Sequence, residues 1–95
     1  MQHELKTWPE GFQAIAQGRK TADVRFNDRG FKVGDILLLR EYYPGTGKYS
    51  GENVEAEVTH IMDTEGFGLK PGYVMLSLRP IPSQIAPLDV EKLPK

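Results

Sequence analysis

Alternation of apolar and polar residues predicts that most of this chain is β-strand. Between residues 21 and 26, three apolar side chains alternate with Thr21, Asp23 and Arg25. This period of two is typical of a strand with two different faces, and it places Asp23 and Arg25 side by side on one of them. Other segments show the same pattern or a short apolar run bounded by turn residues. These further strands are predicted at residues 3–6, 36–43, 53–61 and 73–78.

One helix is predicted, between the first strand and Gly18. Trp8, Phe12 and Ile15 recur at helical spacing and form one apolar stripe. Residues 7–10, Thr-Trp-Pro-Glu, match a capping box, in which the Thr7 hydroxyl would accept a hydrogen bond from the amide three residues later. Gly18 is typical of a helix C-terminus. The pattern therefore predicts a helix of about two to three turns.

Glycine- and proline-rich segments separate the predicted strands. Residues 44–51 contain Gly-Thr-Gly-Lys, but Tyr42 and Tyr49 stand where a phosphate-binding loop requires glycine and Ser or Thr, so a long hairpin loop is predicted instead. Four prolines between residues 80 and 94 exclude a central strand there and predict an extended tail. One helix followed only by strands predicts an α+β fold that is mostly β: a small mixed β-barrel with one short N-terminal helix packed beside it.

Charge and composition restrict the classes of partner. The 95-residue chain has a formal net charge of −1, yet residues 19–32 hold five basic and two acidic side chains. Such a local basic patch favours a focused anionic ligand over sequence-blind binding of duplex, which needs many phosphate contacts. The absence of cysteine excludes disulfides and thiolate chemistry. With no signal-like apolar stretch and no membrane span, we expect a cytoplasmic monomer.

Residues 18–25, Gly-Arg-Lys-Thr-Ala-Asp-Val-Arg, resemble the Gly-x-Lys-x-x-(Glu/Asp)-x-Arg signature of ASCH domains, which belong to the PUA-like superfamily. The resemblance extends over about residues 2–78. Over this length the chain is similar to a bacterial and phage subgroup of ASCH-like proteins of unassigned function. The further segments that carry it are His-x-Leu-Lys at 3–6, Asn-Asp-Arg at 27–29, Val-Gly-Asp-Ile-Leu at 33–37, Glu-Tyr at 41–42, Tyr-Ser-Gly at 49–51 and Gly-Tyr-Val at 72–74. It implies a PUA-like domain over residues 1–79, with a cleft beside the helix, followed by a proline-rich C-terminal tail over residues 80–95.

The resemblance also implies a class of ligand. ASCH domains are thought to bind RNA or related ligands, and some small members hydrolyse the amide of N4-acetylcytidine with a lysine, a threonine nucleophile and a glutamate from a later loop. Lys20 matches that lysine, whereas Asp23 occupies the position of the threonine; Glu65 is the guess for the glutamate. An enzyme of this kind would therefore need Asp23 to activate a water molecule or to act as the nucleophile.

The first hypothesis is a binding module for RNA, a nucleotide or a nucleoside. Lys20 and Arg25 would engage phosphate or base edges, and Asp23 would set their geometry. The alternative for Asp23 and Arg25 is a surface ion pair worth under about 1 kcal/mol. Further ligand-binding candidates are Arg29 and Asn27 at the rim and Trp8 or Tyr49 for stacking. Asn27 has an alternative role as a turn residue, and the aromatic residues have an alternative role in packing.

Two other functions stay open from the sequence. One is a small amidohydrolase acting on an acylated nucleoside, with Lys20 and Asp23 as its catalytic residues. The other is a phage-type accessory domain that binds a protein partner through the C-terminal tail. His3 and His60 are the only histidines, and they show no metal-ligand spacing, so neither a metal nor another cofactor is expected.

Overall fold

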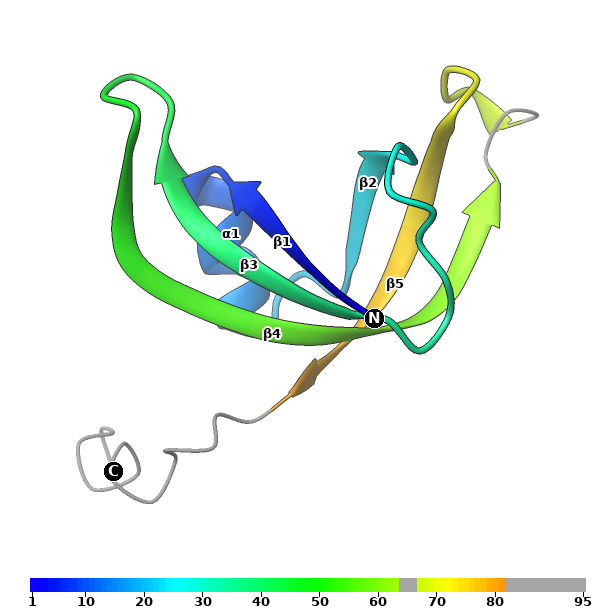
Figure 1. Ribbon diagram of the computed structural model, residues 1–95, viewed down its shortest axis with the longest axis horizontal. Helices are drawn as coiled ribbons and strands as arrows, with labels where there is room; N and C mark the ends of the chain where they lie inside the picture. Colours follow the sequence, from blue (N-terminus) through cyan, green and yellow to red (C-terminus); the bar gives the residue numbers. More distant parts are fainter. Residues whose placement is uncertain (64–66, 82–95) are drawn as a thin grey trace.

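The computed structural model describes residues 1–63 and 67–81, which form a curled sheet with one short helix (Figure 1). Strands dominate, as the alternation predicts, and α1 is the only helix among the described residues. The elements in chain order are β1 (Gln2–Thr7), α1 (Pro9–Ala16), β2 (Ala22–Phe26), β3 (Ile36–Tyr43), β4 (Lys48–Asp63) and β5 (Tyr73–Ile81). The predicted mostly β fold with one short N-terminal helix is therefore confirmed.

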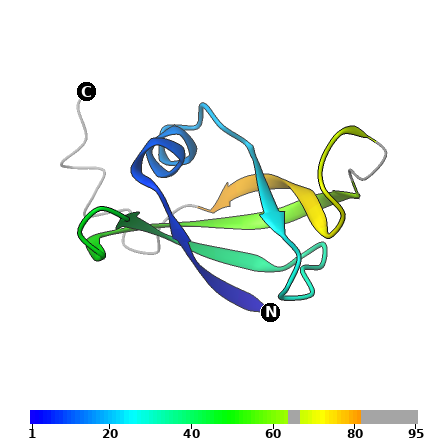
Figure 2. The same cartoon turned by 90° about the horizontal axis from the view of Figure 1, so that it is seen from above.

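The five strands form one sheet in the order β1-β3-β4-β5-β2. β1 pairs with β3 in parallel, and every other neighbouring pair is antiparallel. The sheet curls until its two edge strands, β1 and β2, face each other across a gap that we call the seam (Figure 2). Because β1 and β2 share no ladder, the sheet is a half-barrel and not the closed barrel that the sequence suggested.

The core lies inside the curl of the sheet and beneath α1. Its largest fully buried side chains come from the three central strands, and they are Leu37, Leu39, Val58 and Leu76. The helix contributes Phe12 and Ile15, and the loop after β2 contributes Phe31. Burial of each such side chain stabilises the fold by roughly 1.5–3 kcal/mol. The helix therefore closes one side of the half-barrel through its apolar stripe.

The start of α1 differs from the capping box predicted by the sequence. The N-cap is Trp8, no side chain caps the helix, and Pro9 occupies its first turn. Thr7 is instead the last residue of β1, where it is opposite Glu41 of β3, so strand pairing overrides the local capping pattern. Trp8 is 65% exposed and does not join Phe12 and Ile15 in the core. The Thr7 hydroxyl is consequently free to serve the site described below.

The last strand passes the proline at which the predicted tail begins. β5 continues through Pro80 to Ile81 and pairs there with β4, so the strand crosses the expected boundary at residue 79. Pro80 is tolerated because β2 has already ended beside this part of β5. The Leu78 amide donates to the Thr21 carbonyl, on the side of β5 that faces β2. Two residues further, the backbone nitrogen of Pro80 points to the same side, where β2 no longer pairs, so no hydrogen bond of the sheet is lost. The remaining tail, residues 82–95, lies outside the described residues.

A buried acid–histidine pair fixes the start of β1 against the turn before β3. Asp35 Oδ2 lies 2.8 Å from His3 Nε2 and accepts a hydrogen bond of 3.0 Å from the Lys32 amide. Asp35 Oδ1 also lies 3.3 Å from the N-terminal amine. The hydrogen bond with His3 is the main cause that holds the pKa of Asp35 below its ordinary value of 3.8, against the opposing effect of burial. His3 thus has a structural partner.

Candidate functional site

β2 brings Asp23 and Arg25 together on the inner face of the half-barrel, as the alternation predicts. Asp23 Oδ2 accepts a hydrogen bond of 2.7 Å from Arg25 Nε. The side chains of Asp23 and Arg25 are only 12% and 23% exposed, so this is not a surface ion pair. The apolar side chains of the same strand point outward instead, with Val24 46% and Phe26 52% exposed. The polar face of β2 is therefore the one that faces the interior.

Lys20 joins this pair from the turn that ends α1. Its Nζ lies 3.6 Å from Asp23 Oδ1, and its side chain remains 42% exposed. The turn is fixed by the amides of Arg19 and Lys20, which both donate to the Ala14 carbonyl. The ammonium packs against the first turn of the helix, where a Cβ on Gly11 would lie 3.6 Å from Nζ. A Cβ at this distance makes an ordinary contact, so only a side chain longer than that of alanine at position 11 would compete with Lys20 for space.

The two arginines bridge the seam between β2 and β1. Arg25 Nη1 donates to the Lys6 carbonyl and Nη2 to the Thr7 hydroxyl, each at 3.1 Å, and Arg29 Nη1 donates to the Glu4 carbonyl at 3.1 Å. The Met1 carbonyl accepts a hydrogen bond from the Ile36 amide of β3. In a parallel ladder with this register, the backbone groups of the odd-numbered residues of β1 form the hydrogen bonds with β3. The even-numbered residues therefore present their backbone to the seam. Arg25 and Arg29 satisfy two of these edge carbonyls.

Two hollows lie on either side of the Asp23–Arg25 pair. The first has a volume of about 530 Å³ and exposes Lys20 and Asp23; its other lining residues are Arg19, Thr21, Ala22, Val24 and Met75. The second has a volume of about 390 Å³ and lies along the seam; its lining residues are Glu4, Leu5, Lys6, Arg25, Arg29 and Tyr49. In each hollow the basic side chains outnumber the acidic ones. The arrangement suits an anionic ligand.

The remaining predicted residues divide between the site and the framework. Arg29 and Tyr49 line the seam hollow. Asn27 has the structural role, because its Oδ1 accepts a hydrogen bond of 2.9 Å from the Phe31 amide and so shapes the turn after β2. Trp8 lines neither hollow. Glu65 lies outside the described residues.

Three residues beside the site were not predicted as site residues from the sequence. Thr7 accepts from Arg25, and Gly11 leaves room for Lys20. Glu41, paired with Thr7 in the β1–β3 ladder, is buried and accepts a hydrogen bond of 3.2 Å from Gln13 Nε2 on α1. The signals that point to these residues are a glycine inside a predicted helix and an acid within an apolar strand run.

Other kinds of site have no support in the described part of the chain. Among residues 1–63 and 67–81, no three His, Asp or Glu side chains gather in a way that could hold a metal ion. The single described helix is too short to cross a bilayer.

Comparison with known proteins places the chain in a family. The domain of unknown function DUF3850 matches residues 2–78, which contain β1 to β4, most of β5 and the lining residues of both hollows. The chain is 34% identical over 89 residues to the "Uncharacterized 12.9 kDa protein in GpA 3'region" of Escherichia phage P2, covering 94% of this chain and 76% of that protein. The crystal structure of hypothetical protein PH0355 is similar in fold, with a TM-score of 0.58 and 19% identity over 85% of this chain and 100% of that one. On the match over residues 2–78 and the phage relative, the chain belongs to the DUF3850 family.

Proposed function

We propose that this chain is an ASCH-like domain of the PUA-like type that binds a nucleotide or single-stranded RNA through the hollows beside β2. The observation that carries the proposal is the half-buried Asp23–Arg25 pair with Lys20 beside it. Asp23 holds both cations at the boundary between the two hollows, in orientations fixed before a ligand arrives. Preorganised cations lose little conformational entropy on binding, which favours affinity for phosphate and for base edges.

The charges around the seam support an anionic ligand. Arg29 donates to a neutral carbonyl, and Lys6 lies over the ring of Tyr42, 4.8 Å from its centroid. Neither side chain forms an ion pair with a carboxylate of the described residues. Glu4, the acid that lines the same hollow, is paired with Arg40, and cations without an ion-pair partner attract phosphate more strongly than cations already paired. The seam hollow is therefore the second point at which a phosphate would bind.

Binding is favoured over catalysis because both Asp23 oxygens already have partners. Oδ2 accepts from Arg25, and Oδ1 lies 3.6 Å from the Lys20 ammonium. A carboxylate whose two oxygens both face cations of the protein has its acceptor positions occupied and is poorly placed to bind and orient a water molecule or to attack a substrate. The role that fits these contacts best is the orientation of Lys20 and Arg25.

A second candidate function is hydrolysis of an acylated nucleoside, since Lys20 and Asp23 line the same hollow. A water oxygen would bond to the acyl carbon, the amide bond between that carbon and N4 would break, and a proton from the water would pass to N4, so that N4-acetylcytidine would give cytidine and acetate. Incubation of the protein with N4-acetylcytidine, followed by chromatography, tests this reaction. Formation of cytidine that is lost in Lys20→Ala would support hydrolysis, and no product over hours would exclude it for this substrate.

The binding function is tested by fluorescence anisotropy with labelled single-stranded RNA of about eight nucleotides. Lys20→Ala is expected to weaken binding roughly tenfold, because it removes one ion–phosphate contact from a site with few such contacts. The matched control is Lys48→Ala, which removes the same charge from the exposed first residue of β4. Equal affinities for the wild type and Lys20→Ala would overturn the proposal, as would equal losses in both variants.

A further inference from the structure

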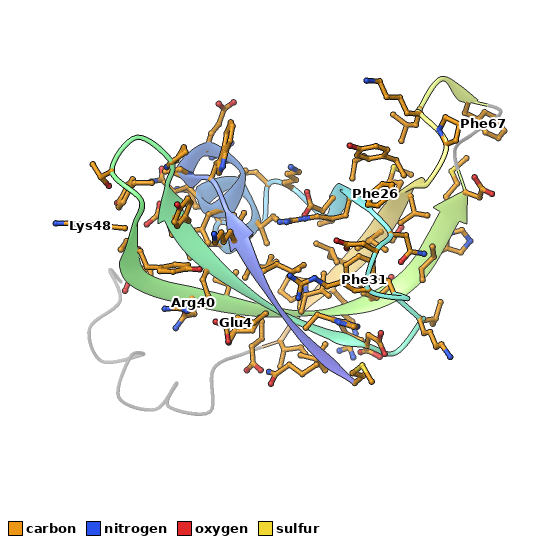
Figure 3. All side chains as sticks on the ribbon, turned by 45° about the horizontal axis from the view of Figure 1, so that its top comes forward. Glu4, Phe26, Phe31, Arg40, Lys48 and Phe67 are labelled. Atoms are coloured by element: carbon orange, nitrogen blue, oxygen red, sulfur yellow. The ribbon has the colours of Figure 1, made fainter. Side chains whose placement is uncertain are left out.

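A cluster of cations and tyrosines covers the outer face of β1, β3 and β4. Arg40 Cζ lies 3.8 Å from the centroid of the Tyr49 ring, and Lys6 Nζ lies 4.8 Å from that of Tyr42. The two tyrosine rings meet edge to face, with centroids 5.1 Å apart. We call Lys6, Arg40, Tyr42 and Tyr49 the tyrosine face. Figure 3 shows Arg40 beside Glu4, the carboxylate with which it pairs at 2.7 Å.

An irregularity in the β3–β4 ladder builds this face. Arg40 is opposite Asn53 and Tyr42 is opposite Tyr49, so three residues of β4 lie between these pairs against one of β3. Gly51, at φ +96, adopts the left-handed backbone that the bulge requires. The extra residues of β4 bring Tyr49 opposite Tyr42, on the same side of the sheet as Arg40. The two rings thereby become neighbours of the cations on β1 and β3.

The tyrosine face is continuous with the seam hollow. Lys6 and Tyr49 belong to both, and the hollow extends from them to Arg25 and Arg29. Tyr49 keeps 38% of its surface exposed, so its ring remains available for contact. A continuous path of cations and aromatic surface thus leads from Lys20, past the Asp23–Arg25 pair, along the seam and onto the outer face of the sheet.

We infer that the ligand of this site is a single-stranded oligonucleotide of several nucleotides, whose bases stack on the tyrosine face while its backbone follows Lys20, Arg25 and Arg29. This inference rests on the proposed function and narrows its ligand, a nucleotide or single-stranded RNA, to a strand long enough to reach the tyrosine face. Tyrosine rings and stacked guanidinium planes bind bases of any sequence, because every base has a π-face. Duplex ligands do not fit this surface, because their bases are already stacked and unavailable to the rings.

The length of the RNA tests the inference. The affinities of a mononucleotide, a dinucleotide and a single-stranded RNA of about eight nucleotides are compared by anisotropy or, for the short ligands, by NMR titration. For the wild-type protein, the affinity is expected to rise at least about tenfold from the dinucleotide to the long RNA. In Tyr49→Leu the long RNA is expected to bind at least about fivefold more weakly, because a stacking surface for its bases is lost.

Two controls separate stacking from a loss of structure. Tyr49→Phe keeps the ring and is expected to bind the long RNA as the wild type does, and Arg40→Gln is expected to weaken long RNA without affecting the dinucleotide. Phe67→Leu removes an aromatic ring that is 75% exposed and far from the tyrosine face, and it should change no affinity (Figure 3).

Each outcome decides between the two proposals. Lys20→Ala could weaken the binding of RNA of every length while Tyr49→Leu and Arg40→Gln weaken the binding of none. The tyrosine face would then play no part, and only the inference of a longer strand would be overturned. Equal wild-type affinity for the dinucleotide and the long RNA would also overturn that inference alone. If the wild-type protein binds none of the ligands, the proposed function falls with it.

Discussion

Arg25 and Thr7 join the two edge strands of the sheet, with Arg25 Nη2 donating to Thr7 Oγ1 at 3.1 Å across a sequence separation of 18 residues. The same guanidinium binds Asp23 of its own strand and the Lys6 carbonyl of β1. Arg25 is thus both a candidate ligand contact and a structural bridge. Its loss is expected to affect stability as well as binding, so Lys20 is the cleaner test of binding alone.

Arg25→Ala is expected to lower the free energy of unfolding by about 1–3 kcal/mol, because it removes two bridges across the seam and leaves Asp23 without its main partner. Arg25→Lys keeps the charge but cannot reproduce the planar fork of donors, so it should restore only part of this loss. Urea unfolding followed by circular dichroism measures both variants. If Arg25→Ala unfolded at the wild-type urea concentration, the bridge would contribute no stability.

Arg29→Ala is expected to alter the salt dependence of RNA binding more than the stability of the fold. Its one hydrogen bond to a described residue is with the exposed edge carbonyl of Glu4, so its removal costs the fold little. If Arg29 contacts a phosphate, the slope of log K against log salt should fall in magnitude by about 0.7–1. Anisotropy titrations at several salt concentrations give this slope, and an unchanged slope would exclude a phosphate contact.

Acid is expected to destabilise the protein partly through Asp35. Because the pKa of Asp35 in the fold is below its ordinary value of 3.8, the ionised carboxylate stabilises the folded state above that pH. This contribution is lost as the pH falls below 3.8 and through the folded-state pKa. Thermal melts from neutral pH down to about pH 3 should therefore show a steeper loss of stability in the wild type than in Asp35→Asn.

The control for Asp35 is Asp28→Asn, which removes an exposed carboxylate from the same connection between β2 and β3. It should retain the wild-type pH profile. If Asp35→Asn and the wild type lost stability in parallel below about pH 4, the His3–Asp35 pair would not account for the acid sensitivity.

Gly72→Ala is expected to destabilise the fold by more than about 1 kcal/mol, because Gly72 has a φ of +88 that L-residues rarely adopt. A Cβ there would also lie 2.7 Å from Phe26 Cε1. Gly45→Ala is the matched control, since no atom lies within 4 Å of its added Cβ. Adding Phe26→Ala to Gly72→Ala should recover only the steric part. Equal urea midpoints for the two glycine variants would contradict this account.

The period-two pattern was sufficient to place the strands and to put Asp23 and Arg25 on one face. It could not tell which face of β2 is interior, and hydrophobicity alone would have chosen Val24 and Phe26, which are exposed. The reason is that β2 is an edge strand whose polar face is satisfied by Lys20 and by β1, contacts that depend on the curl of the whole sheet.

Local rules failed where tertiary pairing competes with them. Thr7 has the sequence context of a helix cap, but pairing with β3 and the bond from Arg25 take it into the sheet. Pro80 has the context of a strand end, but an unpaired edge lets β5 continue. The tyrosine face could not be predicted from the sequence either, because it forms only when the ladder irregularity around Gly51 brings Tyr49 opposite Tyr42.

The strand order has a consequence for synthesis on the ribosome. β2 ends at Phe26, yet its only ladder among the described residues is with β5, where Ala22 pairs with Ser77. The strand that carries Asp23 and Arg25 therefore has to await a partner made some fifty residues later, and a nascent chain that stops before Tyr73 lacks the ladder that holds β2 in the sheet. Ligand recognition should therefore emerge only after β5 has been made, when β3 and β4 are already available to pair.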